Sequence, residues 1–350
     1  MACCLDERQM GLRPARSCRG ALALALVSMA LALPGAAFAH DEPAATAAAT
    51  AASAPATEQA QPMQAVQVSP SVWYVQGLSA LGSSANRNFI SNAGFVVTQT
   101  GVVVIDALGS PALAEQLLGE IRKHTPLPVT HVILTHYHAD HVYGLQTFAR
   151  AGAKIMAHQA GREYLNSETA RLRLQASRTD LAPWIDASTH LVAADEWIDG
   201  PRDIDIGGTR LLLRPVGPAH TPEDLAIYLP QEKVLFACGL RFLPCIPFVG
   251  QANSGQWIKS LDVLLGFDTV AVVPGHGAVS REPRKDMELT RNYLAYLRQT
   301  MGKAARDMTP FDDAYLATDW SAYENLPLFG PANRMNAYNT YLLMEHEDPQ

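Results

Sequence analysis

Residues 132–141 read VILTHYHADH, an apolar run followed by four potential metal ligands within six residues. The apolar run predicts a buried strand, so His136 and His138 leave its end one residue apart and point the same way. Asp140 and His141 open the next amphipathic stretch at a helix N-terminus and point elsewhere. Imidazole nitrogens and carboxylate oxygens are ligands that zinc prefers. The stretch therefore predicts two adjacent metal sites.

Two further histidines follow predicted strands. His220 lies in the segment GPAHTP between the apolar runs 211–215 and 225–229, and His276 lies in the segment PGHG. Taken alone, each is typical of an ordinary loop histidine. Taken in order with the first cluster, His-x-His-x-Asp-His, a distant His and Pro-Gly-His-Gly resemble the metallo-β-lactamase superfamily. The resemblance extends from about Val66 to the C-terminus.

The resemblance implies an α/β fold, the αβ/βα four-layer sandwich of the metallo-β-lactamase type, with metals where the loops of two sheets meet. It also implies two ligand sets, which are His136, His138 and His220 for site 1 and Asp140, His141 and His276 for site 2. Asp106 resembles an Asp of this family that steadies the metal loop. An Asp before Gly109 and Pro111 is equally typical of a turn.

One departure from the family pattern concerns the second metal. Most hydrolases of this superfamily carry Gly-Asp after the strand that matches residues 234–237, and that Asp bridges the metals. Here Gly239 stands where the Asp is expected. We therefore expect one Zn²⁺ firmly bound in site 1 and a second Zn²⁺ more weakly bound in site 2.

Subclass B1 β-lactamases also lack this Asp and use a Cys ligand, with a Lys three residues later that binds the substrate carboxylate. Cys238 and Arg241 have the same spacing, so Cys238 is a candidate ligand and Arg241 a candidate substrate-binding residue. Cys238 lies one residue early, however, and such a shift turns a strand side chain to the other face unless a bulge restores it. Cys238 can instead pair with Cys245, or both can stay thiols.

The predicted chemistry follows from the ligands of site 1. A zinc ion with three protein ligands and an open position lowers the pKa of bound water to near 7. The expected reaction is attack of a metal-bound hydroxide on the carbonyl of an amide, lactam, ester or lactone. We expect Asp140 to act as a catalytic residue that orients the nucleophile or passes on its proton.

The N-terminal segment predicts an exported protein. Four arginines precede the apolar run 21–33, and the small-x-small site Ala37-Phe38-Ala39 follows it. This pattern is typical of a secretory signal peptide, and the run is too short to span a bilayer. We expect a signal peptide over 1–39, an Ala-rich disordered linker over 40–64 and a hydrolase domain with a helical C-terminal extension over 65–350. The predicted location is the periplasm or the medium.

Charge and hydropathy exclude some partners. The net charge is −7, whereas nucleic-acid binding usually shows a basic footprint. After the signal peptide, no stretch has the length and apolarity of a membrane helix. We therefore expect a small-molecule substrate. Two metal dications would make the site locally positive and favour an anionic one.

Three segments resemble exported zinc metallohydrolases associated with pyrroloquinoline-quinone alcohol dehydrogenase systems. They are residues 76–86 (QGLSALGSSAN), 214–224 (RPVGPAHTPED) and 333–341 (NRMNAYNTY). The resemblance implies a periplasmic quinoprotein dehydrogenase system as partner. It also motivates a second hypothesis, a catalytically weak metal-binding accessory protein, because the bridging Asp is missing. A subclass B1-like β-lactamase is a third hypothesis.

Residue patterns predict the elements that carry these motifs. Strands are expected at 72–76, 94–98, 102–106, 132–135, 154–157, 204–206, 209–215, 225–229, 233–237 and 270–273. Helices are expected at 111–124, 141–150, 159–178, 255–266 and 282–302. The polar stretch 77–92 is either a substrate cover or a plain surface loop.

Overall fold

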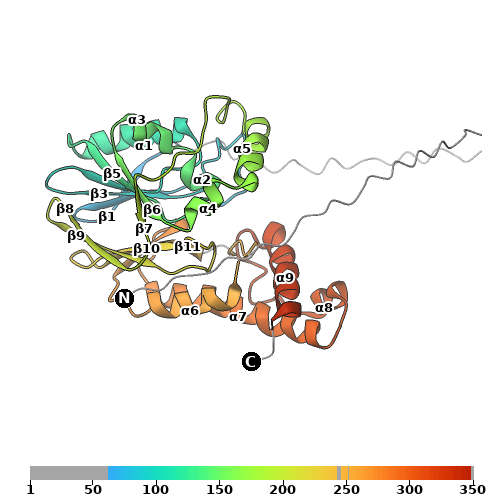
Figure 1. The fold of residues 1–350 in the computed structure, drawn as a ribbon. Coiled ribbons are helices and arrows are strands. Elements are labelled where there is room, and N and C mark those ends of the chain that lie inside the picture. The colour runs from blue at the N-terminus through green and yellow to red at the C-terminus, as the bar shows by residue number, and fades with distance from the viewer. Residues whose placement is uncertain (1–61, 243–245, 251, 348–350) are drawn as a thin grey trace, which may run out of the picture. The chain divides into compact units, whose positions relative to one another are not determined.

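Two β-sheets lie face to face, and helices cover the outer face of each sheet (Figure 1). The structure is a computed structural model, and it describes residues 62–242, 246–250 and 252–347. The arrangement confirms the predicted αβ/βα four-layer sandwich. The predicted signal peptide and nearly all of the predicted linker lie outside the described residues.

The first sheet has seven strands in the order β1-β2-β3-β4-β5-β6-β7. They are Ala65–Ser69 (β1), Val72–Val75 (β2), Ala93–Val97 (β3), Val102–Ile105 (β4), Val129–Ile133 (β5), Lys154–His158 (β6) and Glu196–Ile198 (β7). The pairs from β1 to β4 are antiparallel, and those from β4 to β7 are parallel. The carboxyl ends of β4 and β5 therefore meet at one edge, where the HYHADH segment begins.

The second sheet has five strands in the order β12-β11-β10-β9-β8. They are Arg202–Ile206 (β8), Thr209–Pro215 (β9), Leu225–Leu229 (β10), Val234–Phe242 (β11) and Ala271–His276 (β12). Only the β11–β12 pair is parallel. The loop between β9 and β10 carries His220, and β12 ends on His276.

Each sheet is covered by its own group of helices. Pro111–His124 (α1), Ala139–Val142 (α2), Leu145–Arg150 (α3), Gly161–Leu165 (α4) and Glu168–Asp180 (α5) lie on the side of the first sheet. Ser254–Leu264 (α6), Pro283–Arg306 (α7), Phe311–Ala317 (α8) and Phe329–His346 (α9) lie on the side of the second sheet. The last three follow the last strand of the second sheet in the chain.

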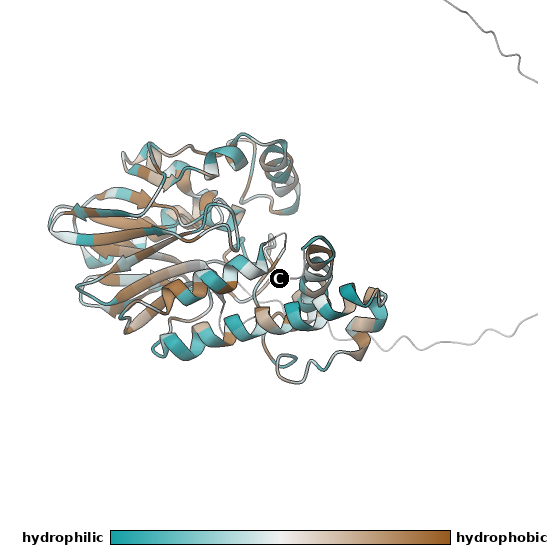
Figure 2. Cartoon of the chain, turned by 60° about the horizontal axis from the view of Figure 1, so that its bottom comes forward, coloured by the Kyte–Doolittle hydropathy of each residue, from teal (hydrophilic) through white to brown (hydrophobic). Residues whose placement is uncertain are grey.

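Apolar side chains fill the space between the two sheets. Val103 and Ile105 of β4 pack in one cluster with Ile227 of β10 and Phe236 of β11. Each fully buried side chain of this kind stabilises the fold by about 1.5–3 kcal/mol. Figure 2 shows the strands as predominantly hydrophobic and the outer helices as largely hydrophilic.

The local sequence decides where several helices begin and end. Helix α1 has the predicted bounds, and Ser110 caps it by accepting a hydrogen bond from Leu113 N. The prediction of one continuous helix over 141–150 was wrong, because this segment is divided between two helices, α2 and α3. Gly144 lies between them, and a Cβ there would come 2.0 Å from the carbonyl oxygen of Ala107. The chain therefore needs glycine where the two segments pass each other.

Two other predictions needed correction. The helix expected over 159–178 is two helices, α4 and α5, and Ser167 caps the second by accepting from Ala170 N at 3.1 Å. Strands β1 and β7 were not predicted. Both lie at the edges of the first sheet, where most of their side chains are not fully buried, so their apolar alternation is weak.

Candidate metal centre

The six predicted ligands come from four places in the fold and meet at one edge of the sandwich. The turn after β5 contributes His136 and His138, and α2 contributes Asp140 and His141. The β9–β10 loop and the end of β12 contribute the remaining two histidines. The structure brings together the ligand atoms of each predicted set to within 4.8 Å of one another, His136, His138 and His220 in one set and Asp140, His141 and His276 in the other.

Site 1 brings three imidazole nitrogens close enough together to share one metal ion. Nε2 of His220 lies 3.0 Å from Nδ1 of His138. Nε2 of His136 is buried and has no hydrogen-bond partner. Zinc at about 2.0–2.1 Å from each nitrogen would separate tetrahedral ligands by roughly 3.3 Å. A buried nitrogen without a partner is costly unless a cation binds it, so the three imidazoles fit zinc.

The orientation of His136 is set by the residue before it. The Thr135 hydroxyl donates to Asp106 Oδ2 at 2.8 Å and lies 3.0 Å from His136 Nδ1. Because its proton is used on the carboxylate, the hydroxyl oxygen accepts from His136 Nδ1–H. This assignment leaves the Nε2 lone pair of His136 directed into site 1.

Site 2 is held together by Asp140. Its Oδ2 lies 3.4 Å from Nε2 of His141 and 3.4 Å from Nε2 of His276. The far nitrogens of both rings are anchored: His141 Nδ1 is 2.9 Å from Asp106 Oδ2, and His276 Nδ1 is 2.8 Å from the carbonyl oxygen of Ile90. Both rings therefore present Nε2, and Nε2 of His141 is buried without a hydrogen-bond partner.

Asp106 links both sites from a fully buried position. Besides His141 and the Thr135 hydroxyl, it accepts from Thr135 N at 2.9 Å. Its φ of 63° is left-handed, a conformation that Asp tolerates better than most residues. The structure thus decides between the two interpretations of Asp106, because its carboxylate orients the ligand loop rather than only closing a turn.

Burial sets the charge state of site 1. It lowers the pKa of His136 and His220 well below the usual value, and the neighbouring imidazoles lower it further. Burial also lowers the pKa of His138, to about 4. All three imidazoles are therefore neutral at pH 7, the form that binds a metal.

The two histidines of site 2 differ, because burial lowers the pKa of His276 whereas that of His141 is raised. Burial by itself lowers the pKa of His141, but the Asp140 and Asp106 carboxylates raise it above its usual value. Burial by itself raises the pKa of Asp140, but His141 and His276 lower it overall. A proton on His141 therefore competes with a metal for site 2.

We expect site 2 to release its metal first when the pH falls. Because the pKa of His141 is raised and those of the site 1 imidazoles are lowered, a proton should displace the metal from site 2 at a higher pH than from site 1. Site 1 should hold its metal until the pH approaches the pKa of His138, about 4. Elemental analysis after dialysis at a series of pH values measures this order. Simultaneous loss from both sites, or earlier loss from site 1, would contradict the assignment.

Residues 90–92 are a part of the site that the sequence analysis missed. Asn92 Nδ2 donates to the carbonyl oxygens of Pro274 and Gly277, both at 2.8 Å, and Asn92 N donates to that of Gly275 at 2.7 Å. Ser91 Oγ donates to the carbonyl oxygen of Asp140 at 2.5 Å. The polar pair Ser91-Asn92 directly before an apolar strand was the available signal.

These contacts revise the view of the loop 77–92. Its C-terminal end is a structural support of site 2, because residues 90–92 bind both sides of His276. In the middle of the loop, the carbonyl oxygen of Ser84 accepts from Trp184 Nε1 at 2.8 Å, and the Arg87 guanidinium lies 5.0 Å from the Trp184 ring centre. The middle and the C-terminal end of the loop are therefore attached to the fold.

Two acidic residues after His220 order its loop, and one of them binds the loop of the first sheet. Glu223 Oε1 accepts from Tyr137 N at 3.1 Å, between the two site 1 histidines of that loop. Asp224 accepts from Thr221 N and the Thr221 hydroxyl, both at 2.8 Å. Burial raises the pKa of Asp224 to about 7. This loop therefore holds His220 opposite the first sheet.

Gly239, which stands where related hydrolases carry the bridging Asp, lies on β11 directly beside His220. A Cβ at Gly239 would lie 2.6 Å from Cδ2 of His220, so the imidazole fills the space next to that residue. The register between β11 and β12 shifts on both sides of Cys238. The side chains of Cys238 and Arg241, and all of Cys245, lie outside the described part of the structure.

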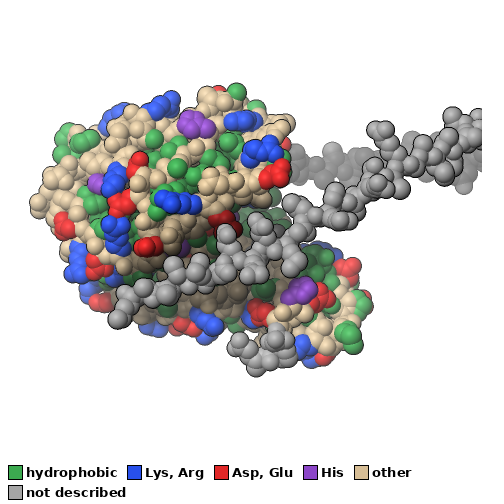
Figure 3. Space-filling model, viewed as in Figure 1, with side chains coloured by type: hydrophobic (Ala, Val, Ile, Leu, Met, Phe, Trp, Pro, Cys, Tyr) green, Lys and Arg blue, Asp and Glu red, His purple; other side chains and the backbone are tan. Residues whose placement is uncertain are grey.

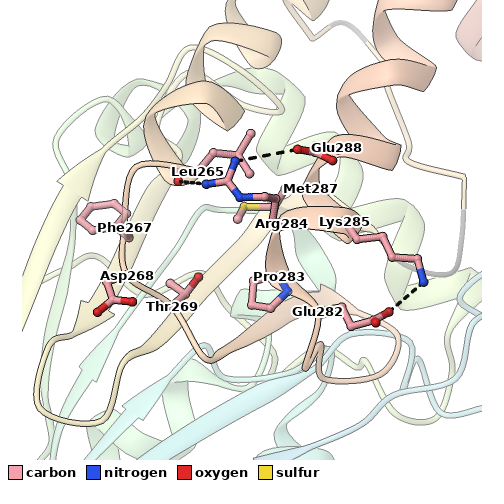
Figure 4. A pocket seen from close by; sticks show the side chains of 10 residues that line it. All are labelled: Leu265, Phe267, Asp268, Thr269, Glu282, Pro283, Arg284, Lys285, Met287 and Glu288. Atoms are coloured by element: carbon pink, nitrogen blue, oxygen red, sulfur yellow. Dashed lines mark hydrogen bonds and ion pairs between the residues drawn. The ribbon is translucent and has the colours of Figure 1, made fainter.

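A cavity of about 480 Å³ lies far from the metal ligands (Figure 4). It is located between the segment that leads into β12 and the start of α7, at the opposite end of β12 from His276. Its charged side chains are mostly paired, Lys285 with Glu282 at 2.8 Å and Arg284 with Glu288 at 3.8 Å. The two basic side chains of the cavity, Lys285 and Arg284, are thus both paired with a carboxylate.

Charge is mixed on the face drawn in Figure 3, where Lys and Arg side chains alternate with Asp and Glu side chains. Such a surface favours solubility over binding to a large charged polymer. Within the described ranges, no helix combines the length and apolarity needed to cross a membrane.

Comparison with known proteins agrees with this geometry. The family model described as "Metallo-beta-lactamase superfamily" matches residues 86–276, which include all six ligands. The alpha subunit of 2,4-dinitroanisole O-demethylase from Nocardioides sp. (strain JS1661) is 30% identical over 194 residues, 54% of each chain. The linear primary-alkylsulfatase of Pseudomonas sp. (strain ATCC 19151) is 25% identical over 249 residues, 60% of this chain and 46% of that protein.

This chain spans about half the length of those two curated relatives. Among solved structures, the metallo-beta-lactamase from Pontibacter korlensis superimposes with a TM-score of 0.53 at 23% identity. The match covers 67% of this chain and 99% of that one. At this identity the likeness shows the fold alone.

Proposed function

The chain belongs to the metallo-beta-lactamase superfamily, and from this premise we propose that it is a zinc-dependent hydrolase of amides, lactams, esters or lactones. The observation that carries the proposal is the pair of adjacent three-ligand clusters, each with its ligand atoms within 4.8 Å. Two of their imidazoles direct a buried, unpartnered nitrogen inward. Such a donor set matches zinc in ligand type and in number.

The residues of the chain divide the work of the reaction. His136, His138 and His220 would hold the catalytic metal, which supplies a nucleophile at neutral pH and polarises the scissile carbonyl. Thr135 and Asp106 keep two of the ligand rings in one orientation. Asp140 belongs to the site 2 cluster next to site 1, and its lowered pKa keeps it ionised, so its carboxylate could orient the nucleophile and accept its proton.

Replacing Asp140 with Asn tests the catalytic part of this assignment. The amide keeps the size of the carboxylate but cannot accept a proton. We expect kcat to fall by about 10²–10⁴-fold, the usual contribution of acid–base catalysis, with a much smaller change in KM. Steady-state kinetics with zinc in excess measures both. A rise in KM of similar size, with kcat unchanged, would instead assign Asp140 to substrate binding.

A substrate panel tests the activity itself. It should contain a chromogenic cephalosporin, a nitrophenyl ester and a lactone, together with an alkyl sulfate because a relative is an alkylsulfatase. We expect hydrolysis of at least one carbonyl substrate, its loss with a chelator and its return with zinc. Turnover of the sulfate alone would contradict the proposed carbonyl chemistry.

A catalytically weak accessory protein is the second candidate. The crowding at Gly239 favours it, because the bridging Asp of related hydrolases cannot be accommodated there unless His220 moves. Zinc bound to the protein without turnover across the panel would support this role. The partner would then be the periplasmic quinoprotein dehydrogenase system that the sequence resemblance implies, and co-purification with such a dehydrogenase tests it.

Ligation by Cys238 would bring the site closer to the subclass B1 β-lactamases, and Arg241 would then bind a substrate carboxylate. The register shifts around Cys238 support the proposal, because strand alternation no longer dictates the direction of its side chain. We expect free thiols at Cys238 and Cys245 in zinc-loaded protein. Mass spectrometry after alkylation without reduction detects them, and a Cys238–Cys245 peptide in active protein would exclude the ligand role.

The N-terminal segment further supports export of the protein from the cytoplasm. The arginine-rich start, the short apolar run and the Ala37-Phe38-Ala39 site support cleavage after Ala39 and a periplasmic or secreted product. Intact-mass measurement of protein recovered from the periplasm or the medium tests the cleavage site. Protein that retains residues 1–39 and stays in the cytoplasm would contradict it.

A further inference from the structure

Glu223 is a buried acidic side chain that belongs to neither ligand set. Only 4% of its surface is exposed, and it lies in the β9–β10 loop, three residues after His220. A buried carboxyl group destabilises the fold unless it forms hydrogen bonds. Its Oε1 accepts from Tyr137 N at 3.1 Å, across 86 residues of the chain. This contact joins the loop of the second sheet that carries His220 to the ligand loop of the first sheet.

The contact is made at the peptide group between His136 and Tyr137, directly after the first ligand of site 1. A second hydrogen bond lies directly before that ligand, where Leu225 N donates to the carbonyl oxygen of Thr135 at 2.9 Å. The main chain of His136 is thus held on both sides from the second sheet. Leu225 begins strand β10, so the sheet itself positions its N–H. The bond from Glu223 depends instead on a side chain, which a substitution can remove.

The ring of Tyr137 is fixed by elements that belong to the first sheet and its helices. The residue is 1% exposed, and its ring stacks on that of Trp197 in β7 with 6.2 Å between the ring centres. A Cβ at Gly161 would lie 2.6 Å from Cδ2 of Tyr137, so the ring packs directly on the main chain of α4. With its ring and its N–H both held, Tyr137 cannot turn, and the histidines on either side of it keep their directions.

Asp224 orders the short turn that carries both His220 and Glu223. Its carboxylate accepts from Thr221 N and from the Thr221 hydroxyl, both at 2.8 Å. Its carbonyl oxygen accepts from Val216 N at 2.9 Å. These bonds close the turn on itself, so a displacement of Glu223 is transmitted to His220. They do not reach the first sheet, whereas the side chain of Glu223 does.

We propose that Glu223 is a positioning residue for site 1, whose side chain sets the spacing between His220 and the ligand loop 136–138. In the present arrangement Nε2 of His220 lies 3.0 Å from Nδ1 of His138. Loss of the bond to Tyr137 would let the two loops shift against each other, and outer groups that orient ligand histidines typically change metal affinity when removed. The inference rests on the proposed function only in assuming that site 1 binds zinc.

Two substitutions of similar size test this role. Glu223→Gln removes the carboxylate but keeps an oxygen that can accept from Tyr137 N, whereas Glu223→Met removes the acceptor as well. We expect site 1 zinc affinity to fall by about 10–100-fold for Glu223→Met and to stay near the wild-type value for Glu223→Gln. Less than one equivalent of zinc is added to metal-free protein in competition with a chromogenic chelator. This measures the tighter site, which we expect to be site 1.

Glu120→Met is the matched control for the loss of a buried acid. Glu120 lies on α1 and is 8% exposed, and its Oε2 accepts from Ala65 N at 3.4 Å, a bond that involves neither ligand set. This variant should lower the urea midpoint of the metal-free protein and leave its zinc affinity unchanged. A purely structural effect of Glu223→Met would have the same signature.

Glu223→Asp provides a second test if the Met variant does not fold. It keeps the charge and the acceptor but is one methylene too short for the bond to Tyr137, so it should weaken zinc binding in the same way. The proposal is overturned if these variants bind zinc as tightly as the wild type, or if Glu223→Gln weakens binding as much as they do. A wild-type protein that binds no zinc would contradict the proposed function itself, which separates the two failures.

Discussion

Replacing His138 with Ala is expected to empty site 1 and to lower kcat/KM by roughly 10³-fold or more. A zinc ion in site 1 would lower the pKa of its bound water to about 7, so its loss would remove the nucleophile at neutral pH. The ring also shares the closest ligand contact of the cluster, 3.0 Å to Nε2 of His220. Zinc content and steady-state kinetics of the purified variant measure the two losses.

His190→Ala is the matched control for this experiment. His190 is an exposed histidine that belongs to neither ligand set, and its Nδ1 lies 3.0 Å from the carbonyl oxygen of Ser188. Zinc content and activity should stay at the wild-type level. Hydrolysis that persists in the His138 variant would remove His138 from site 1.

Asp106→Ala is expected to have the largest effect on stability. It would leave Thr135 N–H, the Thr135 hydroxyl and Nδ1 of His141 without their buried acceptor. Each unsatisfied buried group costs about 1–3 kcal/mol, so we expect a loss of at least about 3 kcal/mol in the free energy of unfolding. Urea unfolding of metal-free protein measures it.

The same variant should weaken metal binding at site 2 by about 10–100-fold, because His141 loses the carboxylate that orients it. Asp106→Asn is the comparison, since Asn also tolerates a positive φ. It keeps one acceptor but places a donor in the buried cluster, so it should be destabilised less than the Ala variant. An Asp106→Ala protein as stable as the wild type would show that this network does not hold the ligand loop.

Short-range patterns predicted much of the fold because they depend on neighbouring residues alone. Helix α1 has the predicted bounds, since its cap Ser110 and its apolar positions lie within one segment. The break at Gly144 was not predictable in the same way. It depends on the carbonyl of Ala107, which belongs to another part of the chain.

The spacing within residues 136–141 indicated two adjacent sites, because it directs neighbouring side chains to two points. Turn residues after apolar strands drew attention to His220 and His276, and the family resemblance implied the full ligand sets. What orients these ligands depends on contacts that exist only in the folded chain. Asp106 and Asn92 act across 35 and 185 residues to reach His141 and Gly277. Such contacts arise where strands distant in sequence end at one edge, and no local pattern encodes that distance.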